Sequence, residues 1–204
     1  MTIPSRSEAA RLLRSLEPPE WFLRHACAVA DVAAWLARRA AARGLDVDPV
    51  LVDTGALLHD VDKLPAGEIR SVVGPRSAMR HGDGSAAWFE QRGWEELAPV
   101  ARDHPVTRLA DPGYESWVAS APLEALIVAY ADKRAGQRLV SMAERFASWH
   151  RRYPTGEWSD GVAWHLVETR ARELERVVCA AAGVEPAEVR RLRWARRALR
   201  EAAT

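Results

Sequence analysis

Residues 49–63 read PVLVDTGALLHDVDK, an apolar run that ends in an imidazole, two carboxylates and an ammonium group. Asp48 and Pro49 predict the start of a helix, because aspartate caps helix N-termini and proline fits the first turn. We expect this helix to extend to about residue 62. Burying His59 beside Asp60 costs several kcal/mol unless both groups have a partner. A metal ion would engage both together, so the segment is a candidate metal site.

The apolar residues keep helical spacing on both sides of this segment. Residues 21–43 form one such stretch, which Gly44 should end. Segments 64–80 and 105–120, rich in glycine, proline and serine, predict loops with room for short helical turns. No stretch alternates as a strand would, so we predict an all-α fold. Further helices are expected at 5–16, 83–92, 94–103, 121–135, 138–152, 159–182 and 186–202.

The composition is that of an ordinary folded domain. The chain has 204 residues, of which 48% are hydrophobic and 28% charged, and this balance excludes low-complexity disorder. We expect one domain over residues 1–204. Within it we predict a metal-binding helical bundle over about 21–138 and accessory C-terminal helices over 139–204.

Charge, cysteine usage and hydropathy limit the partners. The net charge of +1 gives no sign of a nucleic-acid partner, and the Arg-rich segment 186–202 is better explained as a solvated amphipathic helix. Cys27 and Cys179 are too few for a disulfide framework, which favours a reduced protein with no disulfide partner. No run of about 18 apolar residues occurs, and the N-terminus lacks a signal-peptide pattern. We therefore expect a soluble, cytoplasmic protein with no membrane partner.

Three separate helices each place a metal-competent group on an apolar face. His25 lies on a stripe with helical steps of three and four residues, and His59 and Asp132 follow apolar residues at similar steps. Any one of these groups alone is more often a hydrogen-bonded core residue. Three of them on three helices favour a shared metal. The accompanying stripe residues are Phe22, Val29, Val32 and Leu36; Val52 and Gly55; and Ala125 and Val128.

The order His25, His59-Asp60, Asp132 resembles the H…HD…D pattern of the HD superfamily of metal-dependent phosphohydrolases, over about residues 21–138. Adding His81 and His104 gives a series similar to the six-ligand subset, in which the HD aspartate bridges two metals. The branch that cleaves dinucleoside tetraphosphates symmetrically has a similar layout, including an arginine after the last aspartate, here Arg138.

The resemblance implies two metal positions. His25, His59, Asp60 and Asp132 would hold the first, and His81 and His104 would hold the second with Asp60 as the bridge. Otherwise His81 and His104 would be exposed loop or helix-end residues. Imidazole and carboxylate ligands suit Fe, Mn, Ni, Co or Zn, with one or two ions per chain.

The implied activity is hydrolysis, by metal-activated water, of a phosphate ester or anhydride of a nucleotide or small phosphorylated metabolite. Asp60, Lys63 and Arg138 are the candidate catalytic residues. Lys63 would contact a phosphate or be a solvated helix end. By the resemblance, Arg138 would also contact a phosphate. Otherwise Arg134 and Arg138 would each be a surface charge. The alternatives are a di-iron oxygenase of the same superfamily and a regulatory ligand-binding module.

Asp62 departs from the resemblance, since the family usually has a small residue before the lysine of this motif. An acid here could orient a histidine ligand, or it could oppose a phosphate and alter the substrate. Asp103, adjacent to His104, poses the same question. The sequence leaves both alternatives open.

Overall fold

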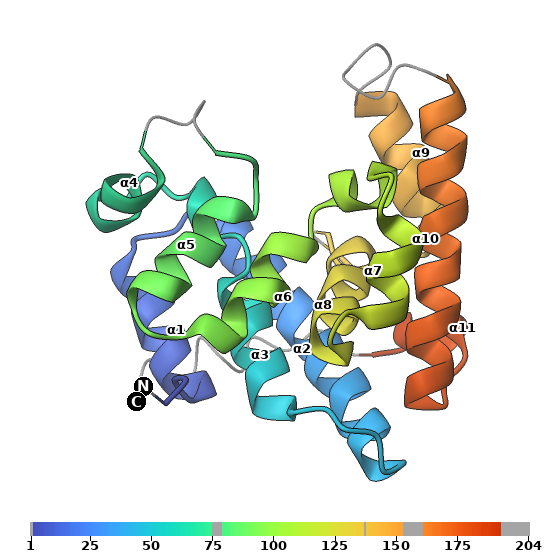
Figure 1. Cartoon of the computed structure of the whole chain (residues 1–204), viewed down its shortest axis with the longest axis horizontal. Helices are drawn as coiled ribbons and strands as arrows, with labels where there is room; N and C mark the ends of the chain where they lie inside the picture. Colours follow the sequence, from blue (N-terminus) through green and yellow to red (C-terminus); the bar gives the residue numbers. More distant parts are fainter. Residues whose placement is uncertain (1, 75–78, 137, 153–160, 193–204) are drawn as a thin grey trace.

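Helices make up the regular structure of the computed structural model, which describes residues 2–74, 79–136, 138–152 and 161–192 (Figure 1). Across these ranges there is no β-strand, only an isolated bridge between Ala135 and Leu139, so the all-α prediction is confirmed. None of the described helices is both long and apolar enough to span a membrane. The α-helices are α1 (Arg6–Ser15), α2 (Glu20–Ala42), α3 (Pro49–Leu58), α4 (Gly67–Val73), α5 (Asp83–Gln91), α6 (Ala98–Asp103), α7 (Tyr114–Ser120), α8 (Leu123–Arg134), α9 (Met142–Arg152), α10 (Gly161–Ala182) and α11 (Pro186–Val189).

Helices α2, α3 and α8 form the centre of the bundle, and each packs against the other two. The predicted stripe on α2 faces this core, since Phe22, Val29, Val32 and Leu36 are all buried. Burial of these side chains contributes about 1.5–3 kcal/mol each, so this face fixes the rotation of α2 about its axis. That rotation also decides where His25 points.

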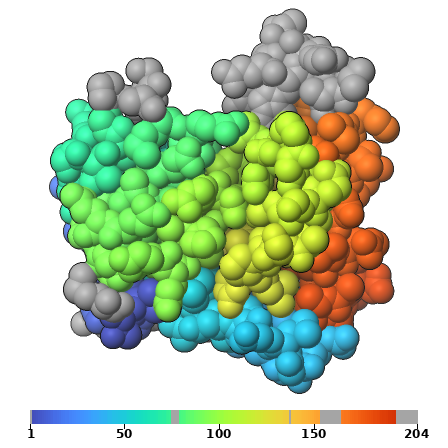
Figure 2. Space-filling view, in the orientation of Figure 1, coloured from blue at the N-terminus to red at the C-terminus, as the bar shows by residue number. Residues whose placement is uncertain are grey.

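Helices α5 and α6 pack against each other, and α6 also contacts α3 and α8. The close approach of α6 to α3 depends on Gly55, because a Cβ there would lie only 2.8 Å from Cγ1 of Val100. In the orientation of Figure 1, the visible face is formed largely by the segments from α4 to α7, with α10 along one edge (Figure 2). These segments carry His104 into the buried interior and place the partly exposed His81 beside it.

Three 3₁₀ turns connect these helices: η1 (Val61–Lys63), η2 (Glu95–Leu97) and η3 (Val106–Ala110). The two predicted loops are thus partly helical, since 64–80 contains α4 and 105–120 contains η3 and α7. Helix α9 begins at Met142 rather than at 138. Helix α11 ends at Val189, and the rest of the helix predicted at 186–202 lies partly outside the described residues.

Arg134 is buried, with 2% of the residue exposed, so its interpretation as a surface charge was wrong. Its guanidinium pairs with Glu175 of α10 at 2.6 Å and donates to the carbonyls of Val140, at 2.7 Å, and Pro186, at 3.0 Å. Two of these partners, Glu175 and Pro186, stand far from Arg134 in the sequence. The side chain therefore joins α8 to α10 and to the start of α11.

Candidate metal centre

Helix α3 ends at Leu58, one turn earlier than predicted, and His59 is its C-terminal cap residue. The backbone leaves helical geometry at Asp60, which has φ −105° and ψ 11°, and η1 follows directly. The prediction of a continuous helix to 62 was wrong, because residues 61–63 take 3₁₀ rather than α-helical geometry. Both Asp60 oxygens face other metal-competent side chains.

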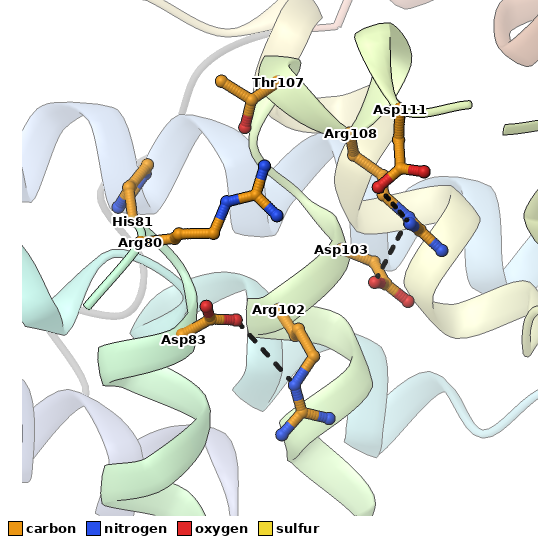
Figure 3. A pocket seen from close by; sticks show the side chains of 8 residues that line it. All are labelled: Arg80, His81, Asp83, Arg102, Asp103, Thr107, Arg108 and Asp111. Atoms are coloured by element: carbon orange, nitrogen blue, oxygen red, sulfur yellow. Dashed lines mark hydrogen bonds and ion pairs between the residues drawn. The ribbon is translucent and has the colours of Figure 1, made fainter. Parts of the chain in front are cut away.

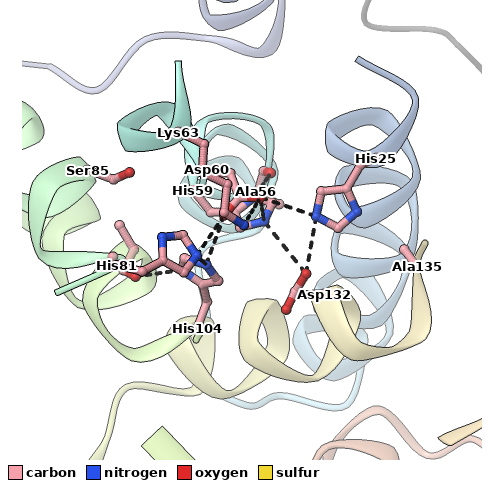
Figure 4. A network of polar contacts seen from close by, with 12 residues as sticks. His25, Ala56, His59, Asp60, Lys63, His81, Ser85, His104, Asp132 and Ala135 are labelled. Carbon is pink, nitrogen blue, oxygen red and sulfur yellow. Dashed lines mark hydrogen bonds and ion pairs between the residues drawn. The ribbon is translucent and has the colours of Figure 1, made fainter. Parts of the chain in front are cut away.

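All six predicted ligands come together around Asp60, whose carboxylate is buried (Figure 4). Its Oδ1 lies 3.1 Å from Nε2 of both His81 and His104, and these two nitrogens are 3.0 Å apart. We call Asp60 with these two histidines the second ligand set.

The other Asp60 oxygen faces His25 and His59, which lie beside Asp132 (Figure 4). We call these three residues together with Asp60 the first ligand set. Its Oδ2 is 3.5 Å from Nε2 of both His25 and His59. Asp132 Oδ1 lies 3.2 Å from His25 Nε2 and 3.8 Å from His59 Nε2. One carboxylate thus presents one oxygen to each set, which is the arrangement of a bridging ligand.

The buried histidines are held with Nε2 toward the cluster. Nδ1 of His59 lies 2.8 Å from the Ala56 carbonyl, and Nδ1 of His104 lies 2.6 Å from the Ala101 carbonyl. A carbonyl only accepts, so each Nδ1 carries the proton and each Nε2 keeps its lone pair. Among the residues that the structure describes, the buried His59 Nε2 has no hydrogen-bond partner. A metal ion would supply the missing partner, so the donor set fits a divalent transition metal.

Burial and neighbouring charges divide the four histidines into two pairs. Burial lowers the pKa of His59 to about 3 and also lowers the pKa of His104. Burial acts the same way on His25 and His81, but hydrogen bonds to carboxylates outweigh it and raise the pKa of each to about 9. His59 and His104 are therefore neutral, whereas His25 and His81 are protonated when the cluster holds no metal.

Both aspartates of the cluster stay ionised, the buried Asp60 and the half-buried Asp132. Burial alone would raise the pKa of Asp60 and of Asp132, but the neighbouring histidines and lysines hold both values well below the usual range. The cluster is therefore built from ionised carboxylates and imidazoles that are neutral or can become so, as metal binding requires.

A family model described as HD domain matches residues 22–136, which is more than half of the chain. This chain belongs to the HD domain family. The matched region begins with α2 and ends just beyond α8, so it contains all six clustered residues. No curated protein and no solved structure matches the chain. The family and the ligand cluster together agree with a metal-binding HD domain.

In this HD domain Asp62 is committed to His81. Its carboxylate lies 3.1 Å from His81 Nδ1 and accepts from the Gly82 amide at 2.7 Å. The Asp62 amide donates to Ser85 Oγ at 3.1 Å. Gly84 leaves room for this arrangement, because a Cβ there would lie 2.9 Å from Asp62 Cβ. Of the two open alternatives, the geometry favours the one in which Asp62 orients a histidine ligand.

Asp103 has a different role. Its carboxylate accepts from Trp117 Nε1 at 2.9 Å and lies 3.6 Å from Nε of Arg108. The neighbouring His104 instead uses the Ala101 carbonyl. Asp103 therefore does not orient the ring of His104, although the two residues are adjacent in sequence.

Two cations beside the cluster differ in exposure. Lys63 Nζ lies 2.8 Å from Asp60 Oδ2, and 43% of its side chain is exposed, so Lys63 lies at the edge of the cluster. Its contact with a phosphate stays a prediction. Lys133, which sequence reasoning missed, is fully buried and donates to the carbonyls of His104 and Ala129, both at 2.9 Å. Lys133 thus fixes the backbone of His104, and its position next to Asp132 is the only sequence signal for it.

Arg138 is exposed, and within the described ranges no hydrogen bond or ion pair joins its side chain to the cluster. Its predicted role as a phosphate contact stays a prediction. Arg145 of α9 lies closer, because it donates to the carbonyls of Asp132, Lys133 and Ala135 and so caps the C-terminal end of α8. No local pattern in the sequence indicates this long-range cap.

Metal binding should release protons, because His25 and His81 have pKa values of about 9 and must lose a proton to bind a metal. We expect about two protons released per chain at pH 7, and affinity that rises up to about tenfold per pH unit for each proton until about pH 9. In the metal-free protein the protonated rings of His25 and His81 stabilise the folded state. This contribution is fully present below the ordinary histidine pKa of 6.5 and is lost as the pH rises through about 9. Calorimetric titrations in buffers of different ionisation enthalpy measure the protons directly. An affinity that is flat between pH 7 and 9 would contradict the assignment.

Asp62→Asn should weaken the second ligand set while leaving the first intact. The amide keeps the size of the side chain but loses the charge that orients His81, which typically costs about 10–100-fold in metal affinity. Metal analysis after dialysis should show that about one ion per chain is lost from a chain that held two. Asp103→Asn is the matched control, since it makes the same change beside His104 without touching the ring. Equal metal content in the two variants would show that Asp62 does not support the site.

Proposed function

We propose that this HD domain is a metal-dependent phosphohydrolase that cleaves a phosphate ester or anhydride of a nucleotide or other small phosphorylated metabolite. The observation that carries the proposal is the pair of ligand sets that share Asp60, one carboxylate oxygen to each set. Nitrogen and oxygen donors of this kind would hold one or two divalent ions of Fe, Mn, Ni, Co or Zn. The HD family includes phosphohydrolases, which supports the same reaction class.

Bound metals of this type lower the pKa of water and polarise phosphoryl oxygens. The chain contributes the geometry. The neutral rings of His59 and His104 are locked by backbone carbonyls, and their Nε2 atoms cannot turn away without leaving a buried N–H unpaired. Lys63, partly exposed beside Asp60, can turn its ammonium group toward a phosphoryl oxygen and offset the charge that develops there.

The test joins metal analysis to a hydrolysis screen over mononucleotides, dinucleoside polyphosphates and cyclic dinucleotides. We expect one to two transition-metal ions per purified chain and phosphate release from at least one substrate class. Oxygen consumption with a polyol or phosphonate, together with intact phosphate esters, would favour the di-iron oxygenase instead. A filled metal site with every ester intact and no oxygen consumed would indicate a regulatory module.

A further inference from the structure

A polar cavity of about 200 Å³ adjoins the second ligand set (Figure 3). His81 belongs to both, because its side chain lines the cavity and its Nε2 faces Asp60. The remaining lining side chains come from the segment around the start of α5, from the end of α6 and from η3. A molecule reacting at the ligand cluster could therefore extend into this cavity.

The character of the cavity is set by its side chains, since all eight that line it in the described structure are polar or charged. Such a lining is mostly polar and offers little apolar surface to a nucleobase or an acyl chain. Three arginines and three aspartates balance in formal charge, so long-range attraction of an ion is weak here. Recognition must come from the groups that remain uncommitted.

The carboxylates at the ends of α6 and η3 already have hydrogen-bond partners within the protein. Asp103 is engaged by Trp117 Nε1 and Arg108, and Asp111 accepts from the Gly113 amide at 2.7 Å and from Arg108 at 3.0 Å. The two carboxylates hold Arg108 in place, and its guanidinium also lies 5.3 Å from the centroid of the Trp117 ring. Asp83 faces Arg102 at 3.9 Å. Asp103 and Asp111 therefore position Arg108 and are not available as cation ligands.

The groups of the cavity that remain free to bind a ligand are hydrogen-bond donors. Arg80 is exposed, and among the described residues its side chain has no hydrogen bond or ion pair. Figure 3 shows its guanidinium extending across the cavity toward Thr107 and Arg108. A guanidinium has five N–H donors, so Arg108 keeps some after pairing with carboxylates. Two arginines and a hydroxyl facing one space suit a phosphate, which arginine binds through paired hydrogen bonds.

We propose that this cavity binds a second phosphate group of the substrate, next to the phosphate that reacts at the metal centre. The inference rests on the proposed function and narrows it, because the preferred substrate class is then a diphosphate or polyphosphate compound rather than a simple monophosphate ester. Arg80 and Arg108 bind the second phosphate, and Asp103 and Asp111 hold Arg108 in position.

The experiment compares two ligands on the metal-loaded full chain by calorimetry: a nucleoside 5′-monophosphate and its non-hydrolysable α,β-methylene diphosphate analogue. We expect the diphosphate to bind about tenfold or more tightly than the monophosphate, because a charge-assisted hydrogen bond is worth that much. Arg80→Gln should remove most of this preference and leave monophosphate binding unchanged. Arg80 is exposed and unpaired in the described structure, so the variant should keep its melting temperature. Arg172→Gln, which removes an exposed arginine from α10, is the matched charge control and should keep the full preference.

The outcomes separate the cavity from the reaction. A diphosphate preference that survives in Arg80→Gln comes from metal chelation and would overturn the inference, as would a wild-type protein with no preference. Orthophosphate that binds in an Arg80-dependent way without competing with the diphosphate would also overturn it, by showing a separate site for free phosphate. Because the comparison measures binding and not turnover, an Arg80-dependent preference in a protein that cleaves no ester would support the cavity while the proposed function fails.

Discussion

Asp60→Ala should empty both ligand sets and abolish phosphate-ester hydrolysis. Asp60 is the one residue that the two sets share, with Oδ1 at 3.1 Å from two histidines and Oδ2 at 3.5 Å from two others. Without its charge, the second set consists of two histidines and the first loses one of its two carboxylates. Metal content should fall below about one ion per ten chains. Loss of a single hydrogen-bond donor to the transition state can lower activity about 10³-fold, and Asp60→Ala should lower it by more than that.

The control for this variant is Asp46→Ala, which removes an exposed aspartate between α2 and α3. It should retain full metal content and activity. Circular dichroism establishes that each variant is folded before metal is measured by mass spectrometry. If Asp60→Ala kept its metal and its activity, the bridging arrangement would not be the basis of the function, and the proposal would fail at its central observation.

The parts of the cluster that could be predicted are those set by helical periodicity. His25 shares a face with Phe22 and Val29, and burial of those neighbours turns the imidazole inward. The same reasoning places Asp132 correctly on α8. Periodicity succeeds here because hydrophobic burial fixes the rotation of each helix, and the polar ligand then follows its apolar neighbours.

The parts that could not be predicted depend on contacts between distant segments. The early end of α3 accompanies contacts of Asp60 with residues as distant as His104, 44 residues later, which helix propensity does not encode. Helix α7 lies in a segment whose composition predicts a loop, and its Tyr114 hydroxyl donates to the Arg170 carbonyl, 56 residues away. Lys133 is buried because two carbonyls accept from it, one of them on His104. Each of these features follows from tertiary structure rather than from local pattern.

Arg134 shows the same limit for a charged residue. From the sequence alone an arginine at the end of a helix is a surface charge, because an isolated buried guanidinium is costly. Its partner Glu175 lies 41 residues later, and the Pro186 carbonyl lies 52 residues later. Only the packing of α10 against α8 brings these acceptors to the guanidinium, so its burial could not be recognised before the fold was known.

Arg134→Met should therefore destabilise the protein by about 3–5 kcal/mol, the usual cost of removing one partner of a buried ion pair. Methionine fills much of the space, so the loss reflects the missing charged donor to Glu175, whose carboxylate still accepts from the Tyr130 hydroxyl, and the missing donors to the carbonyls of Val140 and Pro186. Urea unfolding followed by circular dichroism measures the change. Because Arg134 joins α8 to α10, amide hydrogen exchange should also rise in α10.

Arg172→Met provides the comparison, since Arg172 pairs with Glu168 on the exposed face of α10 and 62% of its side chain is exposed. An exposed pair of this kind contributes about 0.3–0.5 kcal/mol. The free energy of unfolding should therefore fall roughly ten times more in Arg134→Met than in Arg172→Met. Arg134→Lys should recover only part of the loss, because an ammonium group cannot reach Glu175 and two carbonyls in the planar arrangement of a guanidinium. A change below about 1 kcal/mol for Arg134→Met would show that α10 is held by its apolar face, which buries Val167, Leu174 and Val178, and not by this ion pair.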